Sequence, residues 1–370
     1  MKNDKEGLAM KTPEGMTHHQ LTPFISMYTP ASESDKNKLS EFIADNRSQF
    51  MDVLQSRGCV VFRGFTPVGT EAFEDFVTDT LQIDSWNAFN SKGTPKAVAN
   101  WLRKWSEKVL GAGDYRRYLG KATVQLGPVE NSIQGPHVEG GGLIKRSRYL
   151  TLYCDEPGQE RAETGMADFS SVYQQLPLAL QEKLRSGWNE YLYTTSRPLK
   201  LLDKILLRLS PMSCSIDEKG FGLIKGAPCP AVAIVPGTDD IAVQPWAFAR
   251  NANPQVLKAA QDVFSGRGEL TTDSTADALN MRWDVVDKEG ESQGWSPQEQ
   301  YTLFKTIFSN AHLMEWQKGD IALVDNVRMG HWRMDGIQGK RRLIQIQSTP
   351  IDITEHTVPD TNPETDALPA

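Results

Sequence analysis

The sequence has few of the features that mark membrane-spanning, secreted or disulfide-stapled proteins. No apolar run approaches the roughly 18 residues that cross a bilayer, and the first ten residues lack the hydrophobic core of a signal peptide. The four cysteines are widely separated and form no C-x-x-C pair, which disfavours a zinc site or a disulfide scaffold. We therefore expect a cytoplasmic protein with reduced thiols.

An excess of positive charge is also missing. The 40 Lys and Arg residues face 47 Asp and Glu residues, so the net charge is −7, which disfavours nucleic acid as the main partner. The glycine motifs of dinucleotide and phosphate sites and the G-x-S-x-G elbow of hydrolases do not occur. We expect a small-molecule partner, no nucleic-acid or membrane partner, and leave a homo-oligomer open.

Hydrophobic spacing predicts helices and short strands without a regular strand–helix–strand repeat. Helices are expected over residues 36–56, 70–81, 174–186, 198–209, 254–264 and 297–309. Strands are expected over residues 58–65, 149–154, 231–235, 321–324 and 343–347. This pattern favours an antiparallel barrel or sandwich wrapped by helices over a doubly wound sheet.

Six histidines leave few candidates for a metal site. His137 and Glu139 form a His-x-Glu pair, and alternation along an extended segment directs both side chains to one face. About one such pair is expected by chance in this composition, so a surface histidine beside an acid is the alternative. With a third ligand, the pair would form the two-histidine, one-carboxylate face of non-haem iron oxygenases, which leaves three positions open.

A second segment supplies the third candidate ligand. A Lys-Gly-Asp turn at residues 318–320 leads into a buried strand that ends at Asp325 and Asn326, and His331 follows a short loop. Arg342 lies eleven residues after His331. Its planar, permanently charged guanidinium suits a carboxylate partner.

In this order the motifs resemble the TauD/TfdA family of Fe(II)/2-oxoglutarate-dependent oxygenases. The resemblance covers residues 36–350 and rests on the His-x-Glu pair, the segment ETGMAD at residues 163–168, the DN-x4-H segment at 325–331, and the following arginine. The segment GCVVFRGF at residues 58–65 resembles the family's entry strand. The resemblance implies an α+β, mainly β fold, a double-stranded β-helix (a jelly-roll, cupin-like barrel) wrapped by helices.

The resemblance also implies cofactors and ligands. It assigns Fe(II) to His137, Glu139 and His331, with 2-oxoglutarate as co-substrate and O2 as oxidant. Asp325 and Asn326 are expected to shape the loop that presents the second histidine.

The distal carboxylate of 2-oxoglutarate would be held by Thr164 and Arg342. Arg341 is the alternative one position earlier, and the spacing from the histidine favours Arg342.

Two positions depart from the family pattern, and together with Glu139 they bear on which reaction is expected. Ile346 stands where taurine-type members carry a sulfonate-binding arginine, which disfavours a sulfonate substrate. Gly140–Gly142 replaces an aromatic residue and permits either a mobile backbone or a tight turn. Because Glu139 is present, halogenation is disfavoured. The expected reaction is hydroxylation, desaturation or cyclisation of a small molecule, such as an amino acid or a specialised-metabolite intermediate.

Two other classes remain as alternatives. A zinc hydrolase could use the same three ligands but would not need the threonine or the arginine, and a non-catalytic ligand-binding barrel would not need all three ligands. Substrate contacts could come from Gln125, Asn131, Trp246, Arg250 and Arg333.

The position of the ligands also bears on the number of domains. A chain of 370 residues allows two domains, but two candidate ligands lie far apart in sequence and must meet at one ion. We therefore predict a single oxygenase domain over residues 23–350 with a helical insert or lid within about 180–295. Residues 1–22 would form a loose arm and residues 351–370 a loose acidic tail.

Overall fold

The computed structural model describes residues 12–86, 116–120, 123–126, 132–208, 213–247, 254–270 and 281–359, together with residues 95, 97–98, 101–102, 105 and 108–109. Within these ranges, no helix combines the length and apolar character needed to cross a membrane.

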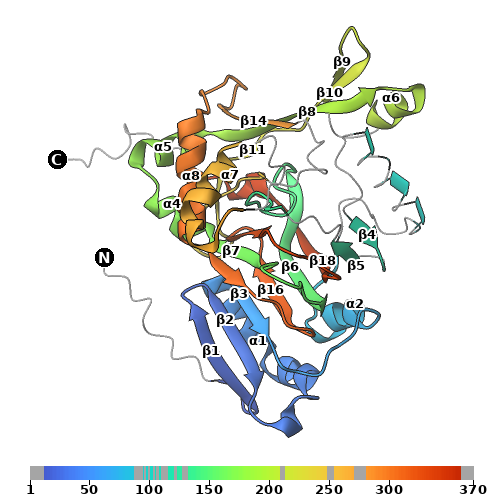
Figure 1. Cartoon of the computed structure of the whole chain (residues 1–370), viewed down its shortest axis with the longest axis vertical. Helices are drawn as coiled ribbons and strands as arrows, with labels where there is room; N and C mark the ends of the chain where they lie inside the picture. Colours follow the sequence, from blue (N-terminus) through green and yellow to red (C-terminus); the bar gives the residue numbers. More distant parts are fainter. Residues whose placement is uncertain are drawn as a thin grey trace, which may run out of the picture.

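An eight-stranded sheet runs through the centre of the molecule (Figure 1). In spatial order its strands are β1 (Met16–Thr22), β2 (Ile25–Pro30), β3 (Cys59–Phe62), β16 (Ile321–Asp325), β6 (Lys145–Glu156), β18 (Arg342–Asp352), β5 (Thr123–Leu126) and β4 (Arg116–Tyr118). All neighbours are antiparallel except β2 and β3. Because β6 pairs with both β16 and β18, segments far apart in the sequence meet at the centre of the sheet.

The two faces of this sheet pack against different partners because successive side chains of a strand point to opposite sides. On β3, Val60 and Phe62 belong to a cluster that includes buried residues of the helix α1 (Leu39–Arg57). Cys59 and Val61 belong to a different cluster on the other side. We call the side packed on α1 the outer face and the opposite side the inner face.

A three-stranded sheet covers part of the inner face. Its strands in spatial order are β15 (His312–Met314), β7 (Thr164–Asp168) and β17 (Met329–Arg333). Met166 and Met329 of this sheet share one buried cluster with Ala322 and Leu343 of the large sheet. A Cβ atom on Gly330 would lie 1.6 Å from the ring of Phe169, so only glycine fits at this position of β17.

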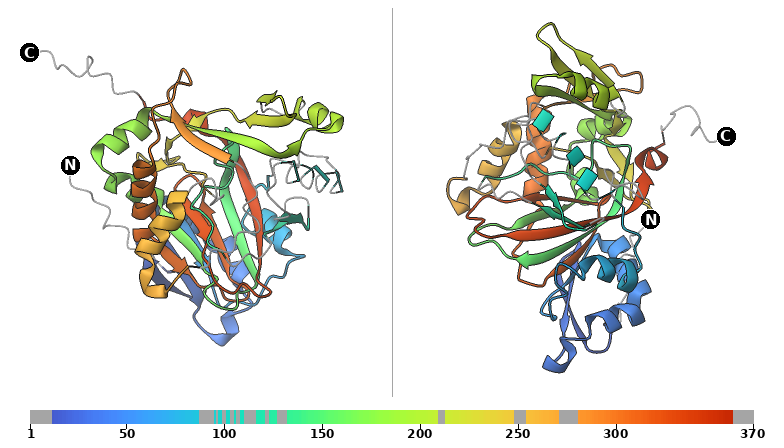
Figure 2. Two further views of the ribbon diagram at one scale, coloured as in Figure 1. Left: turned by 45° about the horizontal axis from the view of Figure 1, so that its top comes forward. Right: turned by 90° about the vertical axis from the view of Figure 1, so that its right-hand side faces the viewer.

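The remaining elements cover the other side of the small sheet and form an arm. The helices are α4 (Phe169–Gln175), α5 (Leu178–Ser186), α6 (Leu201–Arg208), α7 (Pro254–Val263), η4 (Ser265–Arg267) and α8 (Pro297–Ser309). A further sheet contains β8 (Trp188–Pro198), β9 (Ser213–Ile216), β10 (Phe221–Lys225), β11 (Cys229–Pro230) and β14 (Met281–Val286), and β12 (Val232–Ile234) pairs with β13 (Ile241–Val243). Figures 1 and 2 show β9, β10 and α6 projecting from the body of the molecule.

Most of the predicted elements within the described ranges are present, with shifted ends. The start of α8 was the most specific of these predictions. Ser296 accepts a hydrogen bond from the backbone N–H of Glu299, whose carboxylate accepts one from the backbone N–H of Ser296. This reciprocal capping box, with Pro297 in the first turn, confirms the predicted start of the helix.

Three predictions about local order are wrong, and a fourth is right only in part. Residues 16–22 of the predicted loose arm form β1, which pairs with β2. The first residues of the predicted loose tail complete β18 and form η5 (Ile353–His356), where Ile353 is fully buried. The predicted helical insert is largely a sheet built on β8. The predicted helix over 70–81 is a short α2 (Phe73–Asp75) continued by a π-helical turn, η2 (Phe76–Thr80).

Candidate active site

The structure brings His137, Glu139 and His331 together. One ligand atom from each residue lies within 4.8 Å of the others, and Nε2 of His331 is 4.0 Å from Oε2 of Glu139. All three side chains are buried, with 4–8% of each residue exposed. Two imidazoles and one carboxylate that converge in this way fit a divalent iron or zinc ion.

Backbone pairing holds the two histidines at this distance. The N–H groups of His137 and His331 each donate to the carbonyl of the other, at 3.1 and 3.0 Å. On its other side, His137 forms a bridge with Trp246. Nδ1 of His137 lies 2.8 Å from the carbonyl of Gly135, and a carbonyl only accepts, so Nδ1 carries the proton and Nε2 is left to bind a metal.

The carboxylate ligand is fixed by two amide side chains. Oδ1 of Asn326 accepts from the backbone N–H of Glu139 at 2.7 Å, and Nδ2 of Asn326 donates to the Glu139 carbonyl at 3.0 Å. Nε2 of Gln345 donates to Oε2 of Glu139 at 3.4 Å. The first pair fixes the backbone of the ligand, and the second limits the rotation of its carboxylate.

A threonine and an arginine lie together on β7 and at the start of β18. Arg341 donates from Nη2 to the hydroxyl of Thr164 at 3.0 Å, and Trp316 donates from Nε1 to the same oxygen at 2.8 Å. Because both lone pairs of the hydroxyl are used, its hydrogen is left to donate to an acceptor. A hydroxyl and a guanidinium that both donate suit a carboxylate.

Arg341 has no carboxylate partner in the described part of the chain. Its Nε is buried without a hydrogen-bond partner there. Burial, together with the nearby Arg333, lowers the pKa of Arg341 to about 10, so the side chain remains a cation at neutral pH. A partly buried, uncompensated cation next to a hydroxyl donor fits an anionic ligand.

Arg342, which was expected to hold a carboxylate together with Thr164, does not lie beside the threonine; the alternative, Arg341, does. About half of the Arg342 side chain is exposed, and it forms an ion pair with Asp155 instead. The register of β6 and β18 shifts by one residue here, with the extra residue on β6, so the alternation along β18 continues unbroken. Arg341 therefore shares the inner face with Leu343 and Gln345, and Arg342 does not.

The glycine-rich segment after the carboxylate is a tight packing site. A Cβ atom on Gly142 would lie 2.4 Å from the ring of Trp246, and one on Gly141 would lie 2.9 Å from its Cβ. Gly140 has a φ of +72°, a conformation that favours glycine. Gly141 and Gly142 are therefore required by the close approach of Trp246, which was predicted as a possible substrate contact, and Gly140 by its backbone conformation.

The other residues named from sequence fall in several places. Gln125 lies half-buried on β5, and Arg333 ends β17 directly opposite Thr164. Ile346 is fully buried on the outer face. Asn131 and Arg250 lie outside the described residues. Gln345 was not predicted as a site residue. It lies two residues before Gln347 on a buried strand, and without the sheet register nothing in the sequence indicates that it reaches a metal ligand.

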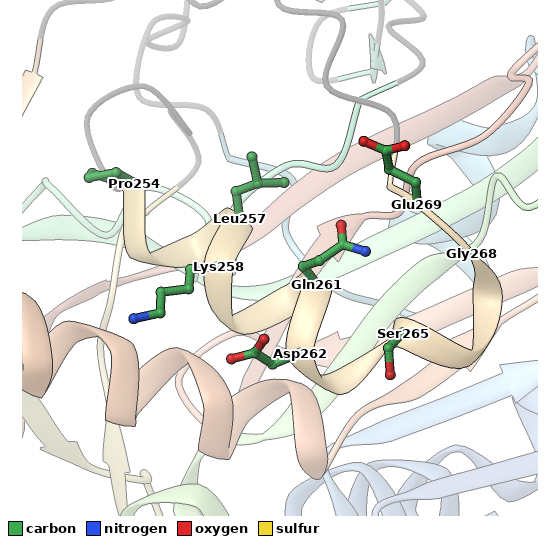
Figure 3. Close-up of a pocket in the computed structure, with 8 residues that line it drawn as sticks. All are labelled: Pro254, Leu257, Lys258, Gln261, Asp262, Ser265, Gly268 and Glu269. Atoms are coloured by element: carbon green, nitrogen blue, oxygen red, sulfur yellow. The ribbon is translucent and has the colours of Figure 1, made fainter.

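A surface hollow lies along α7 and does not include the metal-site residues (Figure 3). Its lining residues are Pro254, Leu257, Lys258, Gln261, Asp262, Ser265, Gly268 and Glu269.

The fold and the three converging ligands define a class of protein, and comparison with known proteins agrees. The model of the family "Taurine catabolism dioxygenase TauD, TfdA family" matches residues 20–347. The chain belongs to this family, whose cofactors are Fe(II), 2-oxoglutarate and O2. Among curated protein sequences, none matches significantly.

Solved structures show the same fold at low identity. PvcB from Pseudomonas aeruginosa is 10% identical, with a TM-score of 0.53 over 92% of this chain and 93% of that chain. PvcB is described as an Fe, alpha-ketoglutarate-dependent oxygenase from an isonitrile synthetic pathway. A Burkholderia xenovorans protein assigned as an alpha-ketoglutarate-dependent taurine dioxygenase is 12% identical, with a TM-score of 0.50 over 91% of this chain and 94% of that chain. The shared architecture is an α+β fold with large sheets.

Proposed function

We propose that the protein is an Fe(II)- and 2-oxoglutarate-dependent dioxygenase that oxidises a small molecule. The observation that carries this proposal is the buried convergence of His137, Glu139 and His331 on one point. The face-to-face packing of the large and small sheets around this point supports a double-stranded β-helix, wrapped by α1 and α8, as the fold.

The three ligands would hold Fe(II), which together with 2-oxoglutarate supplies oxidative chemistry that no side chain can perform. Arg341 and Thr164 would hold the distal carboxylate of 2-oxoglutarate, in place of the pair with Arg342 expected from spacing. The guanidinium supplies charge, and the hydroxyl supplies a directed hydrogen bond. These contacts would fix the length and orientation of the bound dicarboxylate.

Burial of the ligands serves the chemistry in a second way. Glu139, with 5% of its surface exposed, and Asn326, with none exposed, keep the carboxylate side of the site away from bulk water. Exclusion of water strengthens the electrostatic contacts inside the site and protects a reactive oxidant from side reactions. The protein's part is therefore to bind, to orient and to exclude solvent.

The substrate we propose is a small molecule, such as an amino acid or a specialised-metabolite intermediate, and not a sulfonate. Neither Ile346 nor Gln345 on β18 offers the positive charge that a sulfonate needs. Hydroxylation, desaturation and cyclisation are all compatible with this arrangement.

An anaerobic titration tests the proposed function. Fe(II) and 2-oxoglutarate added together should give a visible charge-transfer band, and Fe(II) with succinate should not. The Arg341→Gln variant should need more 2-oxoglutarate to develop the band, and the Arg342→Gln variant should match the wild type. A correctly folded protein that binds Fe(II) but shows no band at saturating 2-oxoglutarate would rule out the proposed complex.

A further inference from the structure

A buried arginine lies close to the backbone that follows the candidate ligand Glu139. Arg146, on β6, is among the largest fully buried side chains, with 1% of its surface exposed. Its Nη2 donates to Oε1 of Gln244 at 2.5 Å. Its Nε and Nη1 are buried and have no hydrogen-bond partner among the residues that the structure describes. None of the Asp and Glu residues in the described ranges forms an ion pair with it.

This arrangement leaves a cation poorly compensated. Burial lowers the pKa of Arg146 to about 10, so the guanidinium is still charged at neutral pH. One neutral amide oxygen does not replace the hydration that a guanidinium loses, and buried charges in folded proteins are normally paired. The two unused N–H groups therefore indicate that an anionic acceptor completes the site.

Gln244 is oriented to serve this arginine. Its Nε2 donates to the carbonyls of Val327, at 2.8 Å, and Ala242, at 3.1 Å. With the amide nitrogen used in this way, Oε1 must face the guanidinium. The guanidinium is thus held through Nη2, and its Nε and Nη1 groups take no part in this contact.

Arg146 lies between the segment that carries Glu139 and the segment that contains Gln244 and Trp246. The Cβ atom of Arg146 is 3.4 Å from the position that a Cβ atom on Gly140, next to Glu139, would occupy. Asn326 donates to the carbonyls of both Glu139 and Ser147, the neighbour of Arg146. On the other side, Gln244 lies two residues before Trp246, which bridges His137.

We propose that Arg146 binds a carboxylate of the substrate, so that the substrate class is a small carboxylic acid. This inference rests on the proposed oxygenase function, because it places the rest of that acid beside the metal ligands. Gly140, which has no side chain, lets the backbone next to Glu139 approach the Cβ atom of Arg146. The hydroxyl of Tyr191 accepts a hydrogen bond from the backbone N–H of Trp246 and is a neutral polar group near Arg146.

The test uses acetate as the probe and metal-free protein, without 2-oxoglutarate, so that the metal contributes nothing. The Arg341→Gln variant is the reference protein, because Arg341 is itself a candidate carboxylate site. Acetate should raise its unfolding temperature by at least about 1 °C relative to equal concentrations of acetamide, and of chloride at the same ionic strength. The shift should vanish when Arg146→Gln is added and persist when Arg342→Gln is added.

Each other result overturns the proposal. Equal stabilisation by acetamide would mean that charge is not recognised, and equal stabilisation by chloride would mean a structural halide site. A shift that survives Arg146→Gln would place acetate elsewhere. If that variant does not fold, Arg146→Lys takes its place, because lysine keeps the charge but lacks the planar fork of donors, and an undiminished acetate shift in it would contradict the proposal. The anaerobic band tests the oxygenase separately, since it requires both metal and 2-oxoglutarate.

Discussion

The two faces of β18 differ in their roles. The inner face carries candidate site residues, and the outer face packs in the hydrophobic core. On the inner face, Gln345 reaches a candidate metal ligand, and Arg341, just before the strand, reaches Thr164. On the outer face, Ile344 and Ile346 are fully buried in the cluster under α1. A shift of one residue in this strand would exchange the two sets.

This comparison shows why neighbouring residues of the same type can have unrelated roles. Arg341 and Arg342 are both arginines, but Arg341 is partly buried beside a hydroxyl and Arg342 forms a half-exposed ion pair. Substitutions on the inner face should therefore change binding and turnover. Substitutions on the outer face should change the free energy of unfolding and leave binding unchanged.

The largest effect is expected at the inner-face carboxylate itself. Glu139→Ala removes one of three ligands, so succinate formation should fall by at least about 100-fold, more than for typical outer-shell substitutions. Fe(II) should also stabilise the variant less against thermal unfolding than it stabilises the wild type. Glu156→Ala, on the exposed end of β6, is the control, and full activity in Glu139→Ala would remove Glu139 as a ligand.

On the outer face, Ile344→Ala tests packing without chemistry. Ile344 is fully buried, so truncation should lower the free energy of unfolding by about 2–5 kcal/mol. The KM for 2-oxoglutarate should not change, because the side chain points away from the candidate ligands. Denaturant unfolding measures the first quantity, and steady-state kinetics measures the second. Ile337→Ala, at a 46% exposed position, should cost less than about 0.5 kcal/mol.

The site could be predicted from sequence where the signal is local. His137 and Glu139 are two residues apart, and His331 follows a strand whose apolar run is evident. Their convergence also requires the pairing of β7, β17 and the 137 segment, which the order of the motifs supports but does not specify. The capping box of α8 was predictable for the same reason, since both partners lie within one turn.

The choice between the two arginines could not be made in this way. Counting eleven residues from His331 selects Arg342. The alternation of side chains along β18 between the inner and outer faces selects Arg341 instead. The face on which each arginine lies depends on the pairing of β18 with β6, and the extra residue at the register shift, Asp155, lies on β6 and leaves the alternation along β18 unchanged. This pairing is a long-range fact, and no local pattern reports it.

The insert was wrongly predicted as helical for a related reason. Along most of β8, buried positions alternate with more exposed ones, but its partner β14 begins at Met281, far along the chain. Similarly, β1 was predicted as part of a loose arm because most of its residues are polar and exposed, whereas it is ordered by pairing with β2 and by Met16, which is buried in the cluster under α1. Edge strands with a polar face give a weak hydrophobic signal.

The third prediction contrasts the two arginines directly. Arg341→Gln should raise the KM for 2-oxoglutarate by at least about tenfold, which corresponds to about 1.4 kcal/mol, since it removes a partly buried charge beside Thr164. Arg342→Gln should change it by less than about twofold, because exposed ion pairs contribute little. Initial rates of succinate formation at varied 2-oxoglutarate measure both. A larger effect from Arg342→Gln would restore the assignment made from spacing.

The smallest effect is expected at Gln345, an inner-face residue that contacts a candidate metal ligand but is not a ligand itself. Gln345→Leu removes the 3.4 Å contact with Oε2 of Glu139. A hydrogen bond contributes about 0.5–1.5 kcal/mol, so the Fe(II) affinity, measured anaerobically against a chelator, should fall about two- to tenfold. Gln347→Leu, two residues further along the same strand, should leave the affinity unchanged. An equal loss in both variants would mean that Gln345 acts through packing of β18 and not through the carboxylate.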